Sequence, residues 1–298
     1  MIVVFLWRLA TALLRALPLR FCHAVAALMA NLVFVCWGEK RRNTVDNMRH
    51  VLPEAAAADV KRVARDSWRN YGRYLVDFLR AADGRAGDLT GAIEFEARHL
   101  IDAAFSEGKG VLLVLMHLGS WDIGGAFFSA LGYRLNVVTE TFDHGRLDSL
   151  VLRARLTSGM RVIPMEGSAL PILRALRRNE ALALLIDRPY ADNGVAVTFF
   201  GEETVLPAGP ARLALRTGAR VIAAAVVHSD GPGSPLRTVV DAGIRIVETG
   251  DRDTDVRVLT EAFLRAHERL IRQYPDQWYM FRRMWRPEAP AERAIATA

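Results

Sequence analysis

Short apolar runs alternate with helix-like stretches along most of this chain, and this rhythm constrains its fold more than any other feature. The runs suit buried strands, whereas the stretches between them have apolar residues at helical spacing. Such alternation produces a mostly parallel sheet covered by helices. We therefore predict an α/β protein, a single αβα domain with a central, mostly parallel or mixed sheet. The expected strands are 111–116, 135–139, 161–165, 181–187, 195–200, 220–227, 238–242 and 244–248, and the expected helices are 123–131, 146–158, 168–178, 210–217 and 254–274.

Two apolar stretches at the N-terminus, residues 2–17 and 21–37, are separated by Pro18 and followed by a basic run from Lys40. The first contains two arginines and is expected to lie in a membrane interface as an amphipathic helix. The second is at the short limit for a transmembrane helix. If it crosses, the basic run holds the rest of the chain in the cytoplasm. We therefore expect a peripheral or single-span protein of the inner (cytoplasmic) membrane, with its catalytic domain on the cytoplasmic face; two ordinary buried helices are the alternative.

These features divide the chain into three segments. Residues 1–45 are expected to form membrane-associating hydrophobic helices, residues 46–286 one folded domain, and residues 287–298 a disordered tail rich in Ala, Pro and Glu. Apolar residues between Pro53 and Asp83 recur at helical spacing, which predicts a long amphipathic helix packed on that domain.

Composition narrows the classes of partner. The 39 basic residues exceed the 33 acidic ones, which gives a net charge of +6 and indicates an anionic partner such as an anionic membrane surface. No recognisable nucleic-acid-binding motif is present, so no nucleic-acid partner is expected. The two cysteines, Cys22 and Cys36, form neither a disulfide framework nor a metal-type spacing, and no metal is expected.

The segment His117-Leu-Gly-Ser-Trp-Asp122 places an imidazole and a carboxylate five positions apart, after an expected strand and before an expected helix. Ligand sites in α/β sheets lie at the carboxyl ends of strands. We expect Asp122 to fold back onto the ring and fix its tautomer, so that His117 acts as a base. Gly119 lets the loop approach a ligand closely, and Trp121 is expected to be a packing residue. In the simpler alternative, His117 binds a backbone carbonyl and Asp122 is only an N-cap.

Common nucleophile and phosphate motifs are absent: the sequence has no G-x-S-x-G, no P-loop and no H-E-x-x-H. A base at His117 is therefore expected to activate a hydroxyl of the substrate, which implies direct transfer without a covalent intermediate. A metal-dependent hydrolase built from His117, Asp122, Asp143 and His144 is a rival, which the lack of a second histidine at ligand spacing weakens.

The six residues, preceded by GKGVLLVLM, resemble the H-x-x-x-x-D box of glycerolipid-type acyltransferases in the form typical of the bacterial lipid A lauroyl/myristoyl acyltransferase family. Four further segments resemble that family in the same order and extend the resemblance over most of the chain. The last half is most similar to the mycobacterial branch, which acylates phosphatidylinositol mannosides. The segments are Asn47–Glu54, Asp187–Pro189 with Gly194–Gly201, Pro207–Ala214, and Gln277–Met280 with Trp285.

The resemblance implies a glycerolipid-acyltransferase-like fold and roles for individual residues. His117 would be the general base, Asp122 would orient it, and Asp187 would complete the proton relay, with Asp here where that branch has Glu. Gly119 and Trp121 are expected to be substrate-binding residues. Glu140 matches a polar position near the acceptor site, whereas Arg155 and Arg188 suit a phosphate of the acceptor or of the donor. A surface location for Glu140 and Arg155 is the alternative.

The implied reaction moves a fatty acyl group from acyl-CoA or an acyl carrier protein thioester to a hydroxyl of a membrane glycolipid, either a lipid A precursor or a phosphatidylinositol-mannoside-like lipid. The thioester is a co-substrate, and no other cofactor is expected. The acyl chain would lie in an apolar groove beside the sheet, and backbone N–H groups of residues 118–122 would stabilise the oxyanion. A lysophospholipid acceptor and a non-catalytic lipid-binding protein of the same fold are the alternatives.

Overall fold

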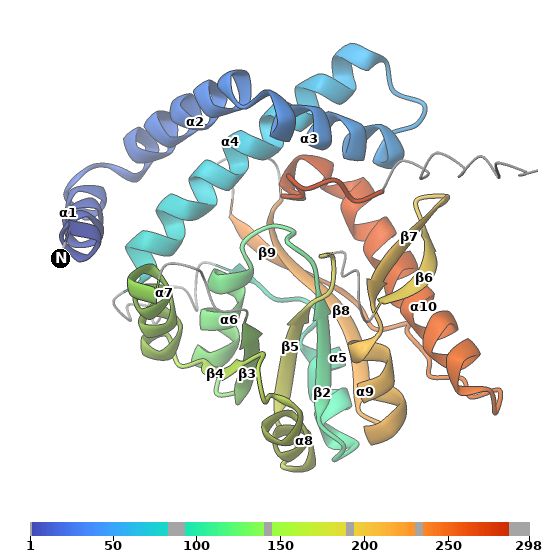
Figure 1. The fold of residues 1–298 in the computed structure, drawn as a ribbon. Coiled ribbons are helices and arrows are strands. Elements are labelled where there is room, and N and C mark those ends of the chain that lie inside the picture. The colour runs from blue at the N-terminus through green and yellow to red at the C-terminus, as the bar shows by residue number, and fades with distance from the viewer. Residues whose placement is uncertain (1, 83–92, 140–144, 189–193, 230–234, 286–298) are drawn as a thin grey trace, which may run out of the picture.

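The computed structural model describes residues 2–82, 93–139, 145–188, 194–229 and 235–285. Its centre is a seven-stranded sheet with the strand order β1-β9-β8-β2-β5-β3-β4. Every neighbouring pair is parallel except β8 and β9. The predicted mixed, mostly parallel sheet is confirmed (Figure 1). The strands are β1 (Ile93–Glu94), β2 (Val111–Leu115), β3 (Leu135–Thr139), β4 (Arg161–Pro164), β5 (Ala181–Leu185), β8 (Arg220–His228) and β9 (Leu236–Asp241).

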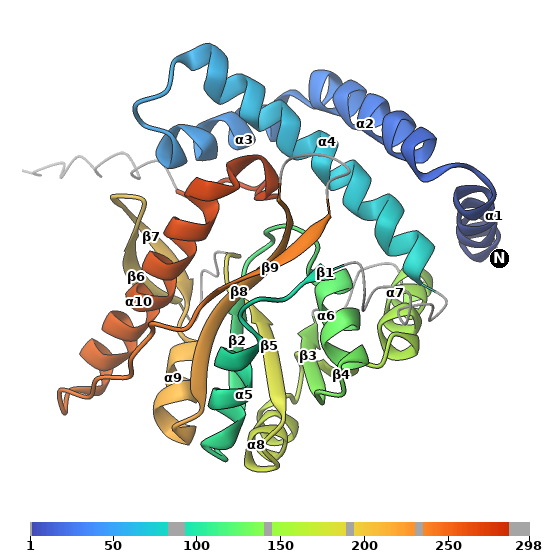
Figure 2. The same cartoon turned by 180° about the vertical axis from the view of Figure 1, so that it is seen from behind.

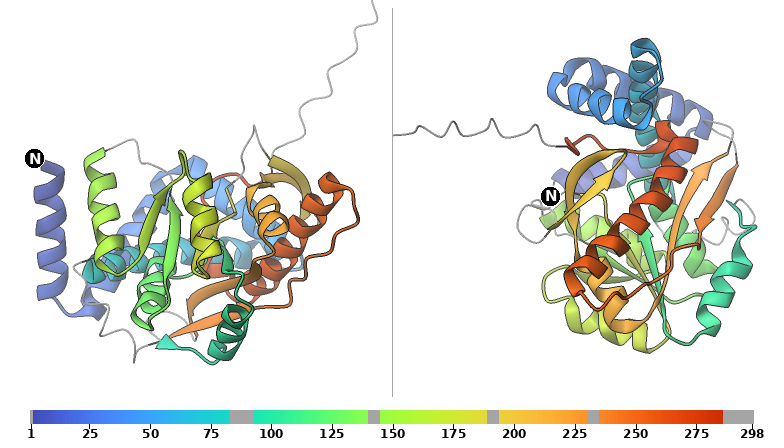
Figure 3. Two further views of the ribbon diagram at one scale, coloured as in Figure 1. Left: turned by 90° about the horizontal axis from the view of Figure 1, so that it is seen from below. Right: turned by 90° about the vertical axis from the view of Figure 1, so that its right-hand side faces the viewer.

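Helices cover both faces of this sheet, which explains why the central strands are apolar on both sides. Alternate residues of β2 face opposite layers: Leu112 packs in the cluster that contains Leu176 and Phe263, whereas Leu113 packs with Phe128. The helices α8 (Ala169–Arg177), α9 (Gly209–Thr217) and α10 (Arg252–Gln273) therefore lie on one face, and α5 (Arg98–Ser106) and α6 (Trp121–Ala130) on the other (Figures 2 and 3). Helix α7 (Gly145–Thr157) precedes β4.

Two expected elements differ from the structure. Residues after the strand at 195–200 do not lead directly to a helix, because β6 (Gly194–Phe199) and β7 (Glu202–Pro207) form an antiparallel hairpin. Residues 244–248 are not a strand. Their alternation has another cause: Ile244 is buried in the main core and Ile246 packs against it, so the apolar side chains are satisfied by packing without strand pairing.

Residues 2–82 form four helices. These are α1 (Ile2–Ala16), α2 (Leu19–Cys36), α3 (Gly38–Val51) and α4 (Ala57–Ala81), of which α4 matches the predicted long amphipathic helix. Helix α2 lies against α4, where a side chain at Gly72 would meet the carbonyl of Ala26 at 2.9 Å (Figure 1). Helix α3 runs continuously through residue 46, where the boundary between two segments was expected.

Large exposed apolar side chains gather on α1 and α2. Phe5 is 65% exposed and Leu28 is 68% exposed, although most side chains of this size are buried in globular proteins. By length and composition Leu19–Cys36 is apolar enough to cross a membrane. One contact of α2 argues against a membrane-spanning position, however. Nε2 of His23 lies 2.7 Å from Asp77 of α4, and both side chains are largely buried.

Candidate active site

His117 lies two residues beyond β2, at the carboxyl edge of the sheet. The ladder between β2 and β8 ends at Val114 and Ala223, and β8 then diverges so that the loop after His117 fits beside it. The loop is fixed there by a bridge between Gly119 and Val226 and by the N–H of Ser120, which donates to the Val226 carbonyl. The expected position of His117 at a strand end is confirmed.

The partner of the His117 ring is Asp187. Its Oδ1 lies 2.7 Å from Nδ1 of His117, and its Oδ2 accepts a hydrogen bond from the His117 backbone N–H at 2.9 Å. Burial by itself would raise the pKa of Asp187, but the attraction of His117 and these hydrogen bonds outweigh it and lower the pKa. Asp187 is therefore an ionised acceptor, which requires the ring proton to be on Nδ1 and makes Nε2 the basic nitrogen.

The C-terminal segment around the short helix Pro275–Gln277 holds this pair in place. The indole N–H of Trp278 donates to Oδ2 of Asp187 at 3.1 Å, and the backbone N–H of Tyr279 donates to the His117 carbonyl at 2.8 Å. The Gln277 carbonyl accepts from the Gly119 N–H at 2.8 Å. Trp278 is fully buried, so its hydrogen bond is shielded from water.

Asn47 anchors the same segment to α3. Its amide donates to the carbonyls of Met280 and Arg282 at 2.9 and 2.8 Å, and its carbonyl accepts from the Met284 N–H at 3.2 Å. In the sequence, Asn47 and the tryptophan motif are only points of resemblance to a family. Their spacing in the chain does not predict that Asn47 fixes the segment that carries the motif.

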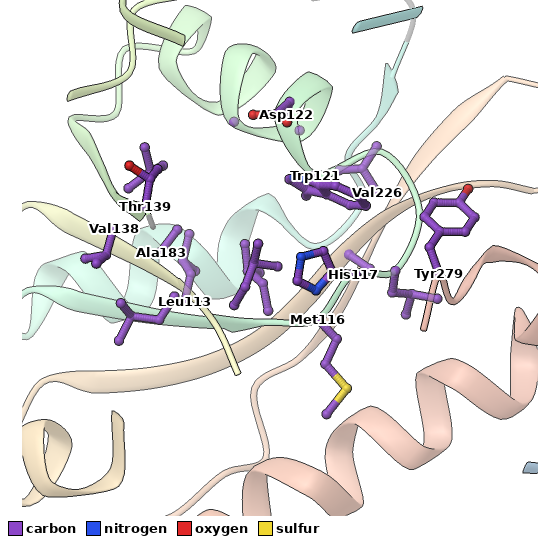
Figure 4. A pocket seen from close by; sticks show the side chains of 18 of the residues that line it. Leu113, Met116, His117, Trp121, Asp122, Val138, Thr139, Ala183, Val226 and Tyr279 are labelled. Atoms are coloured by element: carbon purple, nitrogen blue, oxygen red, sulfur yellow. The ribbon is translucent and has the colours of Figure 1, made fainter. Parts of the chain in front are cut away.

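The expected contact between Asp122 and His117 is wrong. Asp122 accepts hydrogen bonds from the Tyr74 hydroxyl at 2.6 Å and from Nε of Arg155 at 2.7 Å, and Figure 4 shows its carboxylate separated from the His117 ring by Trp121. The physical reason is helical geometry: Asp122 lies in the first turn of α6, and its side chain projects toward α4 and α7. It is not an N-cap, because Ser120 has that position.

Arg155 is consequently paired within the protein, although it also lines the cavity at His117, and its binding of a ligand phosphate stays a prediction. Its side chain is 14% exposed and forms an ion pair with Asp122. Burial by itself would lower the pKa of Arg155, but Asp122 raises it. Burial, reinforced by Asp122, raises the pKa of Tyr74 well above its ordinary value. Asp122 thus joins three helices as a structural centre beside the site. Tyr74 was not singled out from the sequence, where it is one aromatic residue among several on α4.

Gly119 was expected to let the loop approach a ligand, but in the structure it lies against the backbone of Val226. A side chain at Gly119 would lie 2.0 Å from the carbonyl oxygen of Val226, and its φ is +67°, which favours glycine. Trp121 packs edge-on against the His117 ring, with the ring centroids 5.1 Å apart, and lines the adjacent cavity. Trp121 is therefore a packing residue, as expected.

A cavity of about 1360 Å³ opens at His117. Its lining comes from three parts of the fold. A deep part lies between the sheet and helices α5 and α6, a second part lies between α2 and α4, and a third part lies beside α8 and α9. The deep part contains Ile101, Leu113, Phe128, Met160 and Ala183; the second contains Met29, Val33, Trp37 and Leu75; the third contains Ile172, Leu184, Leu213, Arg212 and Arg216.

The remaining expected site residues have different outcomes. Arg188 lines the cavity, one residue after Asp187. Glu140, and Asp143 and His144 of the rival metal site, lie outside the described residues. Within the described ranges, no group of three His, Cys, Asp or Glu side chains is arranged to hold a metal ion.

One buried histidine was missed by the sequence reasoning. His267 of α10 is fully buried, and its Nε2–H donates to the Val114 carbonyl of β2 at 3.0 Å, close to the point where the β2–β8 ladder ends. Burial lowers the pKa of His267 to about 4, so the ring is neutral at physiological pH. In the sequence it is one polar residue in a helix rich in charged residues, and only the fold turns it inward.

A largely buried histidine–aspartate pair whose imidazole lines a large, mostly apolar cavity is typical of the class of enzymes that act on apolar or amphiphilic substrates. The comparison with known sequences then identifies the family. Residues 1–287 match the sequence profile of the bacterial lipid A biosynthesis acyltransferases, and the chain belongs to that family and is an acyltransferase.

Individual relatives agree with this assignment. A phosphatidylinositol mannoside acyltransferase of Mycolicibacterium smegmatis is 30% identical over 256 residues, which cover 83% of this chain and 80% of that protein. A protein of the same name from Mycobacterium tuberculosis is 29% identical over 248 residues, covering 80% of this chain and 75% of the relative. The sequence resemblance to this family and its mannoside-acylating branch is thereby confirmed.

Proposed function

We propose that this acyltransferase moves a fatty acyl group from a thioester of coenzyme A or acyl carrier protein to a hydroxyl of a membrane glycolipid, with His117 as general base. The observation that carries the proposal is the His117–Asp187 pair, whose imidazole lines the cavity. Asp187 accepts the Nδ1 proton, so Nε2 is available to take a proton from the acceptor hydroxyl.

The proposed step needs no covalent enzyme intermediate. As Nε2 of His117 removes the proton, the acceptor oxygen attacks the thioester carbonyl and forms the new ester bond. The C–S bond then breaks, and the leaving thiolate takes the proton from the imidazolium. Asp187 stabilises that imidazolium while it exists.

The oxyanion of this step requires hydrogen-bond donors. The N–H groups of Leu118, Gly119 and Ser120 already donate within the protein. Helix α6 begins at Trp121, and the first N–H groups of a helix have no intrahelical acceptor. We therefore assign the oxyanion to the backbone N–H groups of Trp121 and Asp122, aided by the positive end of the helix dipole.

The deep part of the cavity is the proposed site of the acyl chain. Its lining is apolar and lies between the sheet and α5 and α6, and Figure 4 shows Leu113 and Ala183 of this lining on the strands beside His117. Burying an alkyl chain there stabilises the bound donor by about 0.8 kcal/mol per methylene. Met160 and Phe128 lie at this end of the cavity and are the side chains on which acyl length would depend.

The surface of α1 and α2 is the proposed membrane contact. Exposed apolar residues such as Phe5 and Leu28 suit the acyl-chain region of the bilayer, and the exposed Arg8 of α1 suits anionic headgroups. The largely buried hydrogen bond between His23 and Asp77 ties α2 to α4 and favours an interfacial helix over one that spans the bilayer. We place the protein at the cytoplasmic face of the inner membrane.

The α2–α4 part of the cavity then faces that membrane, which suits an acceptor lipid. We favour a glycolipid acceptor, since the family is described by lipid A biosynthesis and the relatives by phosphatidylinositol mannosides. A lysophospholipid remains the alternative acceptor. Lipid mass spectrometry of cells with and without the gene tests this choice, because one lipid class should lose one acyl chain.

The reaction itself is tested with purified protein, acyl-CoA and vesicles that contain glycolipid acceptor. Release of free thiol and formation of acylated lipid are measured together. We expect H117A to be slower by about 10²- to 10⁴-fold while it still folds and binds vesicles, and H99A, which removes an exposed histidine of α5, to match the wild type. A folded H117A protein with normal activity would refute the mechanism, and a wild type that releases no thiol would favour a lipid-binding role.

A further inference from the structure

The charged residues that line the cavity are almost all basic. Among the described lining residues there is a single carboxylate, Asp122, and it is already paired with Arg155. Because basic residues outnumber carboxylates in the described lining, the cavity favours an anionic ligand. The basic lining residues, besides His117, are Lys40, Arg155, Arg188, Arg212, Arg216, Arg252 and Arg282.

Two of these arginines form a pair on α9. Arg212 and Arg216 are four positions apart, so they project from the same side of the helix, and both are exposed. Gly209, at the N-terminus of α9, lines the same part of the cavity, where the helix dipole is positive. Guanidinium groups and a helix N-terminus are together well suited to a phosphate group.

An apolar path joins this pair to the catalytic histidine. Leu184 of β5, Ile172 of α8 and Leu213 of α9 line the cavity between them. Helices α8 and α9 lie on the same face of the sheet, as Figures 1 and 3 show. A ligand that reaches from His117 to α9 therefore has an uncharged, flexible part next to the sheet and an anionic group at its far end.

We propose that Arg212 and Arg216, with the N-terminus of α9, bind the phosphate of the phosphopantetheine arm that carries the acyl thioester. This proposal rests on the proposed acyl transfer. It places the entrance for the acyl-thioester donor beside α9. Coenzyme A and acyl carrier protein both present their thiol at the end of this arm, so the site recognises what they share. The α2–α4 part of the cavity lies at the other end of the molecule from α9, and it is left for the acceptor lipid (Figure 1).

The test compares donors with and without the phosphate. The R212Q/R216Q protein is assayed with acyl-CoA, with an acyl carrier protein thioester and with an acyl N-acetylcysteamine thioester, which has no phosphate. We expect the KM for the first two donors to rise about tenfold with little change in kcat, since the phosphate loses two charged hydrogen-bond donors that are themselves exposed to solvent. The kcat/KM for the truncated donor should stay unchanged.

The matched control is R174Q/R177Q, which removes two exposed arginines of the neighbouring helix α8 that do not line the cavity. It should match the wild type with every donor. If R212Q/R216Q loses the same factor with the truncated donor, the arginines do not bind a donor phosphate. If only the KM of the acceptor rises, the phosphate belongs to the lipid headgroup, and the proposal is also overturned.

Binding of coenzyme A itself, measured by calorimetry, separates this proposal from the catalytic one. A wild type that binds coenzyme A more tightly than R212Q/R216Q supports the phosphate site even if no acyl group is transferred. Equal affinities overturn the site even if transfer from acyl-CoA is normal.

Discussion

Oδ1 of Asp187 lies 2.7 Å from Nδ1 of His117, although the two residues are 70 positions apart in the chain. The register of the sheet accounts for this contact. Strands β2 and β5 are parallel neighbours in which Leu115 pairs with Leu185, an offset that is also 70. Two residues beyond each strand, the same offset brings the imidazole and the carboxylate together.

Substitutions of the two aspartates should therefore have different consequences. In D187N the Nδ1 proton loses its ionised acceptor, and we expect kcat to fall by about 10²–10⁴-fold with an altered pH–rate profile. In D122N the buried Arg155 loses its charge partner, and we expect a loss of about 3 kcal/mol in the free energy of unfolding. Urea unfolding and pH–rate profiles of both proteins measure these effects. If the residual activity of D122N has a changed profile and D187N the wild-type one, the assignment is reversed.

Trp278 should act on the rate through Asp187. W278F removes the indole N–H that Asp187 Oδ2 accepts, so we expect the pKa of Asp187 to rise and kcat to fall about tenfold. The KM values should change little, since the indole is buried away from the substrates. W285F is the control, because the Trp285 indole donates to the backbone carbonyl of Phe199. An equal loss of kcat in both proteins would indicate a general packing effect.

Gly119 should be irreplaceable for a steric reason. G119A places a methyl group 2.0 Å from the Val226 carbonyl oxygen in addition to the strain of a positive φ, and we expect a loss of more than about 3 kcal/mol in stability. G167A separates the two effects: its φ is +71°, but nothing lies within 4 Å of the added carbon. It should cost only about 1–2 kcal/mol. Thermal unfolding of both proteins measures the difference, and similar losses would exclude the clash.

His267 should make the fold sensitive to acid. Its pKa is about 4 in the folded protein and about 6.5 in an unfolded chain, so between these values the unfolded state binds a proton that the folded state does not. Stability therefore falls as the pH is lowered from 6.5 to about 4, by about 3 kcal/mol from this residue. H267Q keeps an N–H donor for the Val114 carbonyl but has no titrating ring. Urea unfolding at pH 5 and pH 7 should show a smaller difference for H267Q, and an unchanged difference would contradict this role.

Much of the secondary structure was predictable because burial imposes periodicity on the sequence. The apolar runs of β2 and β5 and the helical spacing of α4 give local signals that the structure confirms. The hairpin of β6 and β7 was missed since its second strand carries glutamates and no apolar run. Residues 244–248 imitate a strand because packing against a core can also produce alternation.

The sequence by itself determined the fold class, the family resemblance and the position of His117 at a strand end, since each depends on residues close together in the chain. Only the tertiary structure decided which carboxylate serves the imidazole. That choice depends on which strand lies beside β2, and on the direction in which the first turn of α6 projects Asp122. The tertiary structure also brings Trp278 and Asn47 to the site. Contacts of this kind join distant segments and leave no periodic signal in the chain, so the sequence does not predict them.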